Sequence, residues 1–275
     1  MIRDIEEAAM TMRLEEPFGG AVPESVPLEV TPLTNVLCQI RFPELISIGR
    51  EEIVGTFQER IRKKYPIGDS AKGLIVVIGD DSTQRMESKI WRFLDADQTW
   101  RVTLATEFIT LETRNYQSRD EFCERVGWLC AALAETIDPG WMHRIGVRYV
   151  NRLHGELYDK RLEFVREDMF GPFRIEHDGV IERTLHQVNA TTEEGNMVAK
   201  WGYMPKNYTH DPETMPAIST DSWYLDVDSI WASERPVEFD PGVIVQQCGA
   251  LAGRAYTFFR WGTTQALLDA CGVRS

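Results

Sequence analysis

Two carboxylates, Asp226 and Asp228, stand out because a strand would place both on one face. A strand is predicted over 222–231, and residues two apart along a strand lie about 6.6 Å from each other. At that spacing two carboxylates can converge on one Mg²⁺ or flank two ions, as metal-dependent hydrolases and nucleases require. The further ligands that such chemistry needs would come from the preceding loop, where His210 and Asp211 lie.

An exposed polar strand face produces the same alternation of polar and apolar residues without any metal. We therefore predict no metal site and no cofactor. Instead, we expect Asp226 and Asp228 to accept hydrogen bonds or to pair with Arg or Lys near the start of the last helix.

Arginines on predicted strands form the second candidate site. The strand predicted over 144–153 carries Arg148 and Arg152 on one side, with Asn151 between them, and an earlier strand carries Arg41. Arginine is preferred for bidentate pairing with carboxylate or phosphate. Pairing with carboxylates of the chain itself is the preferred interpretation for these arginines, and contact with a ligand or partner is the alternative.

Other signatures of catalysis are missing from the sequence. It contains no G-x-S-x-G elbow, P-loop, G-x-G-x-x-G or H-E-x-x-H motif. The 5 histidines are not spaced as paired ligands, and the 5 cysteines include no C-x-x-C pair, which indicates reduced core residues.

The composition is that of a folded, acidic protein. Its net charge of −13 argues against non-specific binding of nucleic acid, which depends on clustered Lys and Arg. No run of about 20 apolar residues occurs, and the acidic first 16 residues do not resemble a signal peptide. We expect a cytoplasmic protein without membrane contact, and the sequence leaves its oligomeric state open.

The elements that would position these residues follow from periodicity. Residues 1–29 are expected to form an N-terminal helix and a linker arm. A first half over 30–140 and a second half over 141–275 follow, each with the order β-α-β-β-β-α and an additional strand in the first. The expected strands and hairpins of the first half are 36–42, 73–79, 89–104 and 107–116, with helices over 50–64 and 119–137. The hairpin over 89–104 is expected to turn at residues 95–98. Ser118 is the expected N-cap of the helix over 119–137, which should bury Phe122, Val126, Leu129 and Leu133. The second half has strands and hairpins over 144–153, 183–204 and 222–231, with helices over 156–168 and from 241 to about 270, and Asp240 is the expected N-cap of the last helix.

The repeated order predicts an α+β fold of two similar halves, each an antiparallel sheet covered by a long helix. A short shared pattern supports the duplication. Gln39-Ile40-Arg41-Phe42 and Gly146-Val147-Arg148-Tyr149 occupy corresponding strands, and each contains a β-branched residue, an arginine and an aromatic residue. Arg41 and Arg148 would then project from equivalent faces.

Four motifs carry a resemblance to a known family. They are the patterns PLxxVxxQIRF from Pro32, LxTxxY from Leu111, GxRYxN from Gly146 and LDxD from Leu225. Together they resemble a sporadically distributed family of uncharacterised bacterial proteins over nearly the whole chain, excluding the helix before Pro17. The resemblance implies no activity, cofactor or catalytic residue. A patchy distribution is typical of mobile genes, including phage and phage-defence genes.

Two functions follow from these patterns. The preferred one is a non-enzymatic module that binds a protein or ligand at the open sheet face or the cleft between the halves, in a bacterial or phage accessory system. The alternative is a metal-dependent hydrolase or nuclease that uses Asp226 and Asp228.

Overall fold

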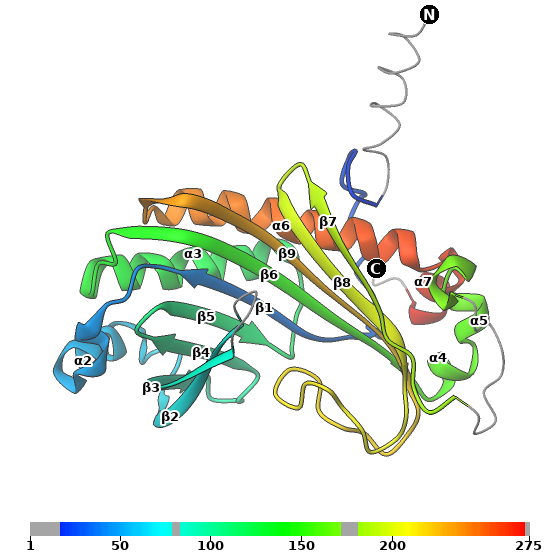
Figure 1. Cartoon of the computed structure of the whole chain (residues 1–275), viewed down its shortest axis with the longest axis horizontal. Coiled ribbons are helices and arrows are strands. Elements are labelled where there is room, and N and C mark those ends of the chain that lie inside the picture. The colour runs from blue at the N-terminus through cyan, green and yellow to red at the C-terminus, as the bar shows by residue number, and fades with distance from the viewer. Residues whose placement is uncertain (1–16, 79–82, 172–180, 273–275) are drawn as a thin grey trace, which may run out of the picture. The chain divides into compact units, whose positions relative to one another are not determined.

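A computed structural model describes residues 17–78, 83–171 and 181–272. The predicted α+β class is confirmed, with all nine strands of the described chain in one sheet (Figure 1). The strand order is β2-β3-β4-β5-β1-β6-β9-β8-β7. The expectation of a separate sheet for each half is wrong, because β1 and β6 pair and join the strands into one sheet. The helix expected within the first 16 residues lies outside the described residues.

The elements before residue 140 follow the predicted order closely. The turn of the predicted 89–104 hairpin is confirmed at Asp95, whose side chain accepts hydrogen bonds from the backbone N–H groups of Thr99 and Trp100. The elements are β1 (Leu33–Arg41), the 3-10 helix η1 (Ile46–Gly49), α2 (Glu51–Ile61), β2 (Ile67–Ile78), β3 (Thr83–Leu94), β4 (Trp100–Ala105), β5 (Phe108–Thr113) and α3 (Arg119–Thr136).

The elements after residue 140 begin with a long strand and end with two helices. They are β6 (Trp141–His154), α4 (Glu156–Asp159), α5 (Arg161–Phe164), the 3-10 helix η2 (Glu167–Phe170), β7 (His186–Thr192), β8 (Gly195–Met204), β9 (Ser222–Glu238), α6 (Pro241–Gly262) and α7 (Gln265–Cys271).

Two helix predictions in this part are wrong for one shared reason. The helix expected over 156–168 is three short segments, and the helix expected to reach about 270 ends at Gly262. Val165 is extended and forms an isolated antiparallel bridge with Thr263. A bridge needs extended backbone at both residues, so it interrupts both helical stretches. Periodicity alone gives no sign of such a long-range contact.

Both predicted helix N-caps are confirmed. Ser118 accepts a hydrogen bond from the backbone N–H of Glu121 at the start of α3. Asp240 accepts bonds from the N–H groups of Gly242 and Val243 at the start of α6, at 2.7 and 3.0 Å. These caps satisfy backbone donors that the first helical turn leaves without partners. The residues predicted as the buried stripe of α3 are indeed buried: Phe122, Val126, Leu129 and Leu133.

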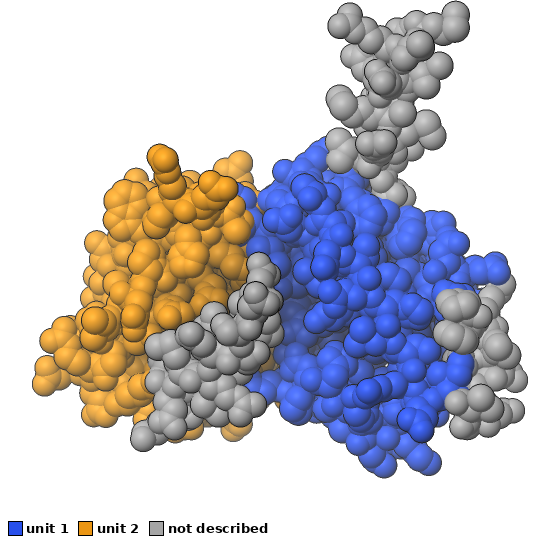
Figure 2. Space-filling view, viewed as in Figure 1, with its two compact units in different colours: residues 1–36, 147–231, 250–275 blue, residues 37–146, 232–249 orange. Residues whose placement is uncertain are grey.

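The chain divides into two compact units, each assembled from separated stretches (Figure 2). Unit 1 comprises residues 1–36, 147–231 and 250–275, and unit 2 comprises residues 37–146 and 232–249. These units do not coincide with the expected halves, because β1, β6, β9 and α6 each contribute residues to both.

Candidate functional site

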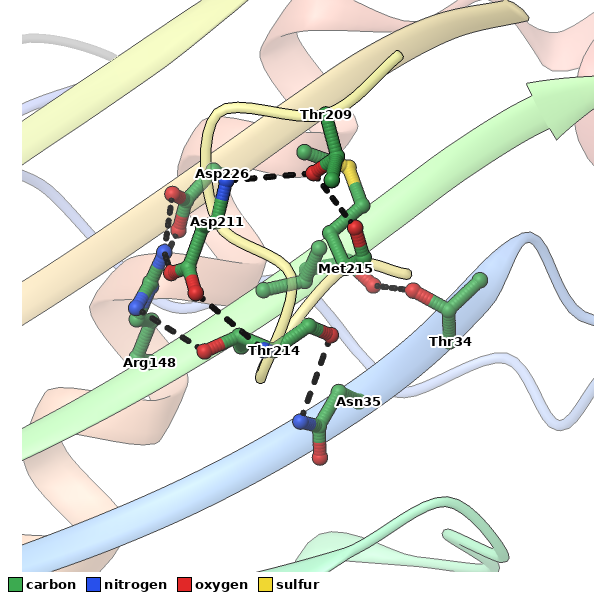
Figure 3. A network of polar contacts seen from close by, with 9 residues as sticks. Thr34, Asn35, Arg148, Thr209, Asp211, Thr214, Met215 and Asp226 are labelled. Atoms are coloured by element: carbon green, nitrogen blue, oxygen red, sulfur yellow. Dashed lines mark hydrogen bonds and ion pairs between the residues drawn. The ribbon is translucent and has the colours of Figure 1, made fainter. Parts of the chain in front are cut away.

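Arg148 lies at the centre of a network of polar contacts in unit 1 (Figure 3). Its Nε and Nη2 atoms donate to the two carboxylate oxygens of Asp226, each at 2.7 Å. Nη2 also donates to Asp211 at 2.8 Å, and Nη1 donates to the hydroxyl of Thr214 at 3.4 Å. The guanidinium therefore holds two carboxylates at once, one of them in the bidentate geometry that arginine favours.

Neighbouring strands explain why Arg148 meets Asp226. Arg148 lies on β6 and Asp226 on β9, which are adjacent in the sheet. Side chains alternate between faces along a strand, so the apolar Leu225 and Val227 occupy the opposite face, where both are fully buried. The prediction that Asp226 accepts hydrogen bonds is confirmed, but its partner is an arginine of a central strand and not an Arg or Lys near the start of the last helix.

Both charges are largely removed from water. The side chain of Asp226 is 5% exposed and that of Arg148 is 22% exposed. Burial alone would lower the pKa of Arg148, but Asp226 and Asp211 outweigh burial and raise it. Burial alone would likewise raise the pKa of Asp211, but the charge and hydrogen bonds of Arg148 lower it. Arg148 and Asp211 thus each favour the charged form of the other.

Through Asp211 the network fixes the segment 205–221, which joins β8 to β9 and which we call the β8–β9 loop. Within this loop Asp211 accepts a hydrogen bond from the N–H of Thr214, and its own N–H donates to the hydroxyl of Thr209. The Thr209 hydroxyl donates to the carbonyl of Met215 at 2.6 Å. These local bonds close a compact turn around the carboxylate that Arg148 holds.

Strand β1 contributes a second attachment for the loop. The side-chain amide of Asn35 donates to the carbonyl of Thr214 at 3.4 Å (Figure 3). The neighbouring Thr34 donates to the carbonyl of Val150 on β6. The loop is therefore bonded to residues of three strands that are consecutive in the sheet, β1, β6 and β9.

Arg152 binds the loop four residues further along β6. It is 3% exposed, and it donates to the hydroxyl of Ser222 at 3.0 Å and to the carbonyl of Pro216 at 2.5 Å. A third contact joins it to the sulfur of Met204. Burial lowers the pKa of Arg152. Arg148 and Arg152 thus hold the loop at two places, which lie roughly 13 Å apart along an extended strand.

Apolar packing fills the space beside the two arginines. Val150, Tyr224 and Met204 on the strands are buried together with Met215 of the loop, and Tyr208 packs against them. The aromatic ring of Tyr224 also contacts the ring of His210, with centroids 5.2 Å apart. The β8–β9 loop is thus held by a small core of its own as well as by ion pairs.

Two other predicted site residues, Asn151 and Arg41, lie apart from this network. Asn151 is 4% exposed and lies on the opposite face of β6, because it is one residue from Arg152. Arg41 lies in unit 2, where it pairs with Glu107 at 2.8 Å. Asp228 shares the face of Asp226 and is partly exposed.

The arrangement around Asp226 favours an ion-pair network over a metal centre. Both carboxylate oxygens of Asp226 accept hydrogen bonds from Arg148, whose positive charge would oppose a metal ion at the same position. Within the described residues, no three or more His, Cys, Asp or Glu side chains are grouped so that they could hold a metal.

A second buried arginine was missed by sequence analysis. Arg254 of α6 is 1% exposed, donates to both carboxylate oxygens of Glu194, and also donates to the carbonyls of Gly19 and Gly20. It thereby anchors the described part of the predicted linker arm. The available signal was an arginine close to Ala250, Leu251 and Ala255 in a predicted helix. Its partners Glu194 and Gly19 lie about 60 and 235 residues away along the sequence, so the signal did not identify them.

Comparison with known proteins adds no assignment. No protein-family model matches the chain, and no curated protein sequence is significantly similar to it. Among the described residues, no helix is both long enough and apolar enough to span a membrane.

Proposed function

We propose that this chain is a non-enzymatic interaction module that binds a protein partner through the β8–β9 loop on the sheet face of unit 1. The observation that supports it most is that Arg148 and Arg152 hold this 17-residue loop in one conformation while much of its surface stays exposed. Loops longer than about 12–15 residues without secondary structure are uncommon in compact domains, and most are functional.

A fixed loop suits recognition for an energetic reason. Ordering a loop at the moment of binding consumes part of the interaction energy, and a loop that is already ordered avoids this loss. His210, Pro212 and Ala217 are exposed on the loop, while Thr214 and Met215 are buried beneath it. The exposed side chains form the contact surface in this proposal, and the arginines are structural.

The proposal also concerns the biological system in which the protein acts. The resemblance to a sporadically distributed bacterial family supports a role in a bacterial or phage accessory system, including phage defence. Genes that flank the coding sequence test this part, because a neighbouring nuclease or toxin gene supports it and only housekeeping neighbours would contradict it.

Capture of the partner from the native host tests the binding function. The tagged full chain is expected to retain a stoichiometric protein, and Ala217→Arg is expected to lose it because the new side chain would project from the loop. Arg62→Ala is the control, since Arg62 lies beyond the end of α2 with its side chain 63% exposed. Equal capture by the wild type and Ala217→Arg would refute the role of the loop.

We further propose that the two halves, 30–140 and 141–275, arose by duplication. In the sheet β1 is followed outward by β5, β4 and β3, and β6 is followed outward by β9, β8 and β7. This mirrored order supports the proposal, while the additional strand β2 and the short helices after β6 are departures from it. Superposition of β1, β5, β4 and β3 on β6, β9, β8 and β7 tests it, with Arg41 expected to fall on Arg148.

A further inference from the structure

Buried thiols gather in the interior of unit 2. The Sγ atoms of Cys123 on α3 and Cys248 on α6 are 3.6 Å apart, within hydrogen-bonding range for sulfur. Cys38 of β1 also interacts with Cys248. Three thiols from a strand and two helices, widely separated in the sequence, therefore meet around Cys248, and all three belong to unit 2.

Close helix packing sets the distance between Cys123 and Cys248. A Cβ at Gly127 of α3 would overlap with Cγ2 of Val245 on α6, so glycine at this position lets the two helices approach. Gly127 lies about one helical turn after Cys123, and Val245 lies about one turn before Cys248. The two contacts thus lie along one line where the helices run in opposite directions. The thiols are held by helical backbone and not by a loop.

The two thiols differ in their access to solvent. Cys123 is 7% exposed, whereas Cys248 is 0% exposed. The hydrogen bond with Cys248 raises the pKa of Cys123, and burial raises it further. A protonated, nearly buried thiol reacts slowly, and bulky reagents reach it poorly. An uncharged oxidant the size of a few atoms would therefore meet Cys123 first and Cys248 only through it.

We propose that hydrogen peroxide converts Cys123 and Cys248 into a disulfide that crosslinks α3 to α6. The sulfur of Cys123 attacks one peroxide oxygen and the O–O bond breaks, which yields a sulfenic acid at Cys123 and one water. The sulfur of Cys248 then forms the S–S bond with Cys123 and displaces the hydroxyl as a second water. The two thiols lose two electrons and two protons, and the peroxide takes up both.

The crosslink needs little movement and has a defined consequence. A disulfide bond is about 2.05 Å long, so the two sulfurs must approach by about 1.5 Å, which rotation of the side chains can supply. The bond would join residues 125 positions apart in the sequence. Closing so long a loop restricts the unfolded chain, so the oxidised protein is expected to be more stable than the reduced one. This crosslink does not depend on the binding proposed for the β8–β9 loop.

Peptide mapping of the full chain, oxidised in its native state with hydrogen peroxide, tests the inference. Free thiols are blocked in denaturant before digestion without reductant. The expected results are a peptide pair linked through Cys123 and Cys248, a loss of two free thiols, and a Tm several degrees higher that dithiothreitol reverses. Cys248→Ala is expected to leave a sulfenic acid at Cys123 that dimedone traps. Cys271→Ala is the matched control, because it removes a buried cysteine of unit 1 and should keep the crosslink.

Three results of the mapping would overturn the inference. They are absence of the link between Cys123 and Cys248 in the oxidised native chain, a link between Cys38 and Cys248 in its place, and a link that forms only when the chain is oxidised in denaturant. An unchanged Tm in the crosslinked chain would refute the stabilising effect. The mapping uses the wild type, so it decides the question even if Cys248→Ala does not fold.

Discussion

Substitution of Arg148 by Met would remove the charge at the centre of the loop network and keep much of the side-chain volume. The carboxylate of Asp226, whose side chain is 5% exposed, would then lose the guanidinium that pairs with it. Asp211 would lose the same partner. Breaking a buried ion pair by removal of one partner destabilises a protein by roughly 3–5 kcal/mol.

This free energy converts to a measurable shift in melting temperature. Unfolding entropy near 2.1 cal/mol/K per residue gives about 580 cal/mol/K for this chain, so each kcal/mol lowers Tm by roughly 1.7 °C. Arg148→Met is therefore expected to lower Tm by about 5–9 °C in scanning calorimetry. This conversion applies to unfolding of the whole chain in one step, and calorimetry tests that condition by comparing the calorimetric and van't Hoff enthalpies.

Two further variants make the test specific. Arg60→Met is the control, because Arg60 pairs with Glu135 at 2.7 Å while both side chains are about half exposed, and exposed pairs of this kind contribute little to stability. Replacement of both partners, Arg148→Met with Asp226→Leu, is expected to recover much of the loss since no buried charge remains at Asp226. A decrease in Tm no larger than that of Arg60→Met would refute the structural role of Arg148.

Three other predictions follow from the titratable and metal-binding groups. The pKa of Asp211 is lowered in the folded chain, so its contribution to the free energy of unfolding is present above its unfolded pKa near 3.8 and is lost as pH falls through the lower folded value. In chemical denaturation Asp211→Asn should therefore be less stable than the wild type at neutral pH, and the difference should shrink below about pH 4. All 5 cysteines are buried. Burial raises the pKa of Cys130 to about 12, and the hydrogen bond to Cys248 raises the pKa of Cys123. Thiol reagents should therefore label the native chain slowly and the unfolded chain at every cysteine, and rapid labelling of a native thiol would contradict this. Calorimetric titration with Mg²⁺ and Mn²⁺ should show no saturable micromolar binding, and binding that Asp226→Asn abolishes would move the hydrolase alternative ahead.

Local patterns predicted much of the fold. The period-2 strand predicted over 36–42, the caps at Ser118 and Asp240, and the turn at Asp95 depend on residues within a few positions of one another. Interactions of that range are visible in a linear sequence. The pairing of β1 with β6 and the bridge between Val165 and Thr263 are long-range contacts, and they account for the single sheet and for both interrupted helices.

The candidate site was predictable only in part for the same reason. The alternation of β6 placed Arg148 and Arg152 on one face, and arginine chemistry indicated carboxylate partners. The identity of those partners depended on which strand lies beside β6 and on the path of the β8–β9 loop, neither of which periodicity determines. Asp211 could therefore be recognised as a loop carboxylate but not as the second partner of Arg148.

The two arginines of β6 hold the loop by different physical means, and the difference bears on its role. Arg148 uses two carboxylates, whereas the contacts described for Arg152 are a hydroxyl, a backbone carbonyl and a thioether. A lid that opens to admit a ligand would have to separate the buried guanidinium of Arg148 from Asp211 and also expose Arg152, which is 3% exposed. Breaking these charge-assisted hydrogen bonds would make the free energy of opening larger than the low values typical of mobile segments. A loop attached in this way is better suited to present a constant surface to a partner than to gate a site beneath it.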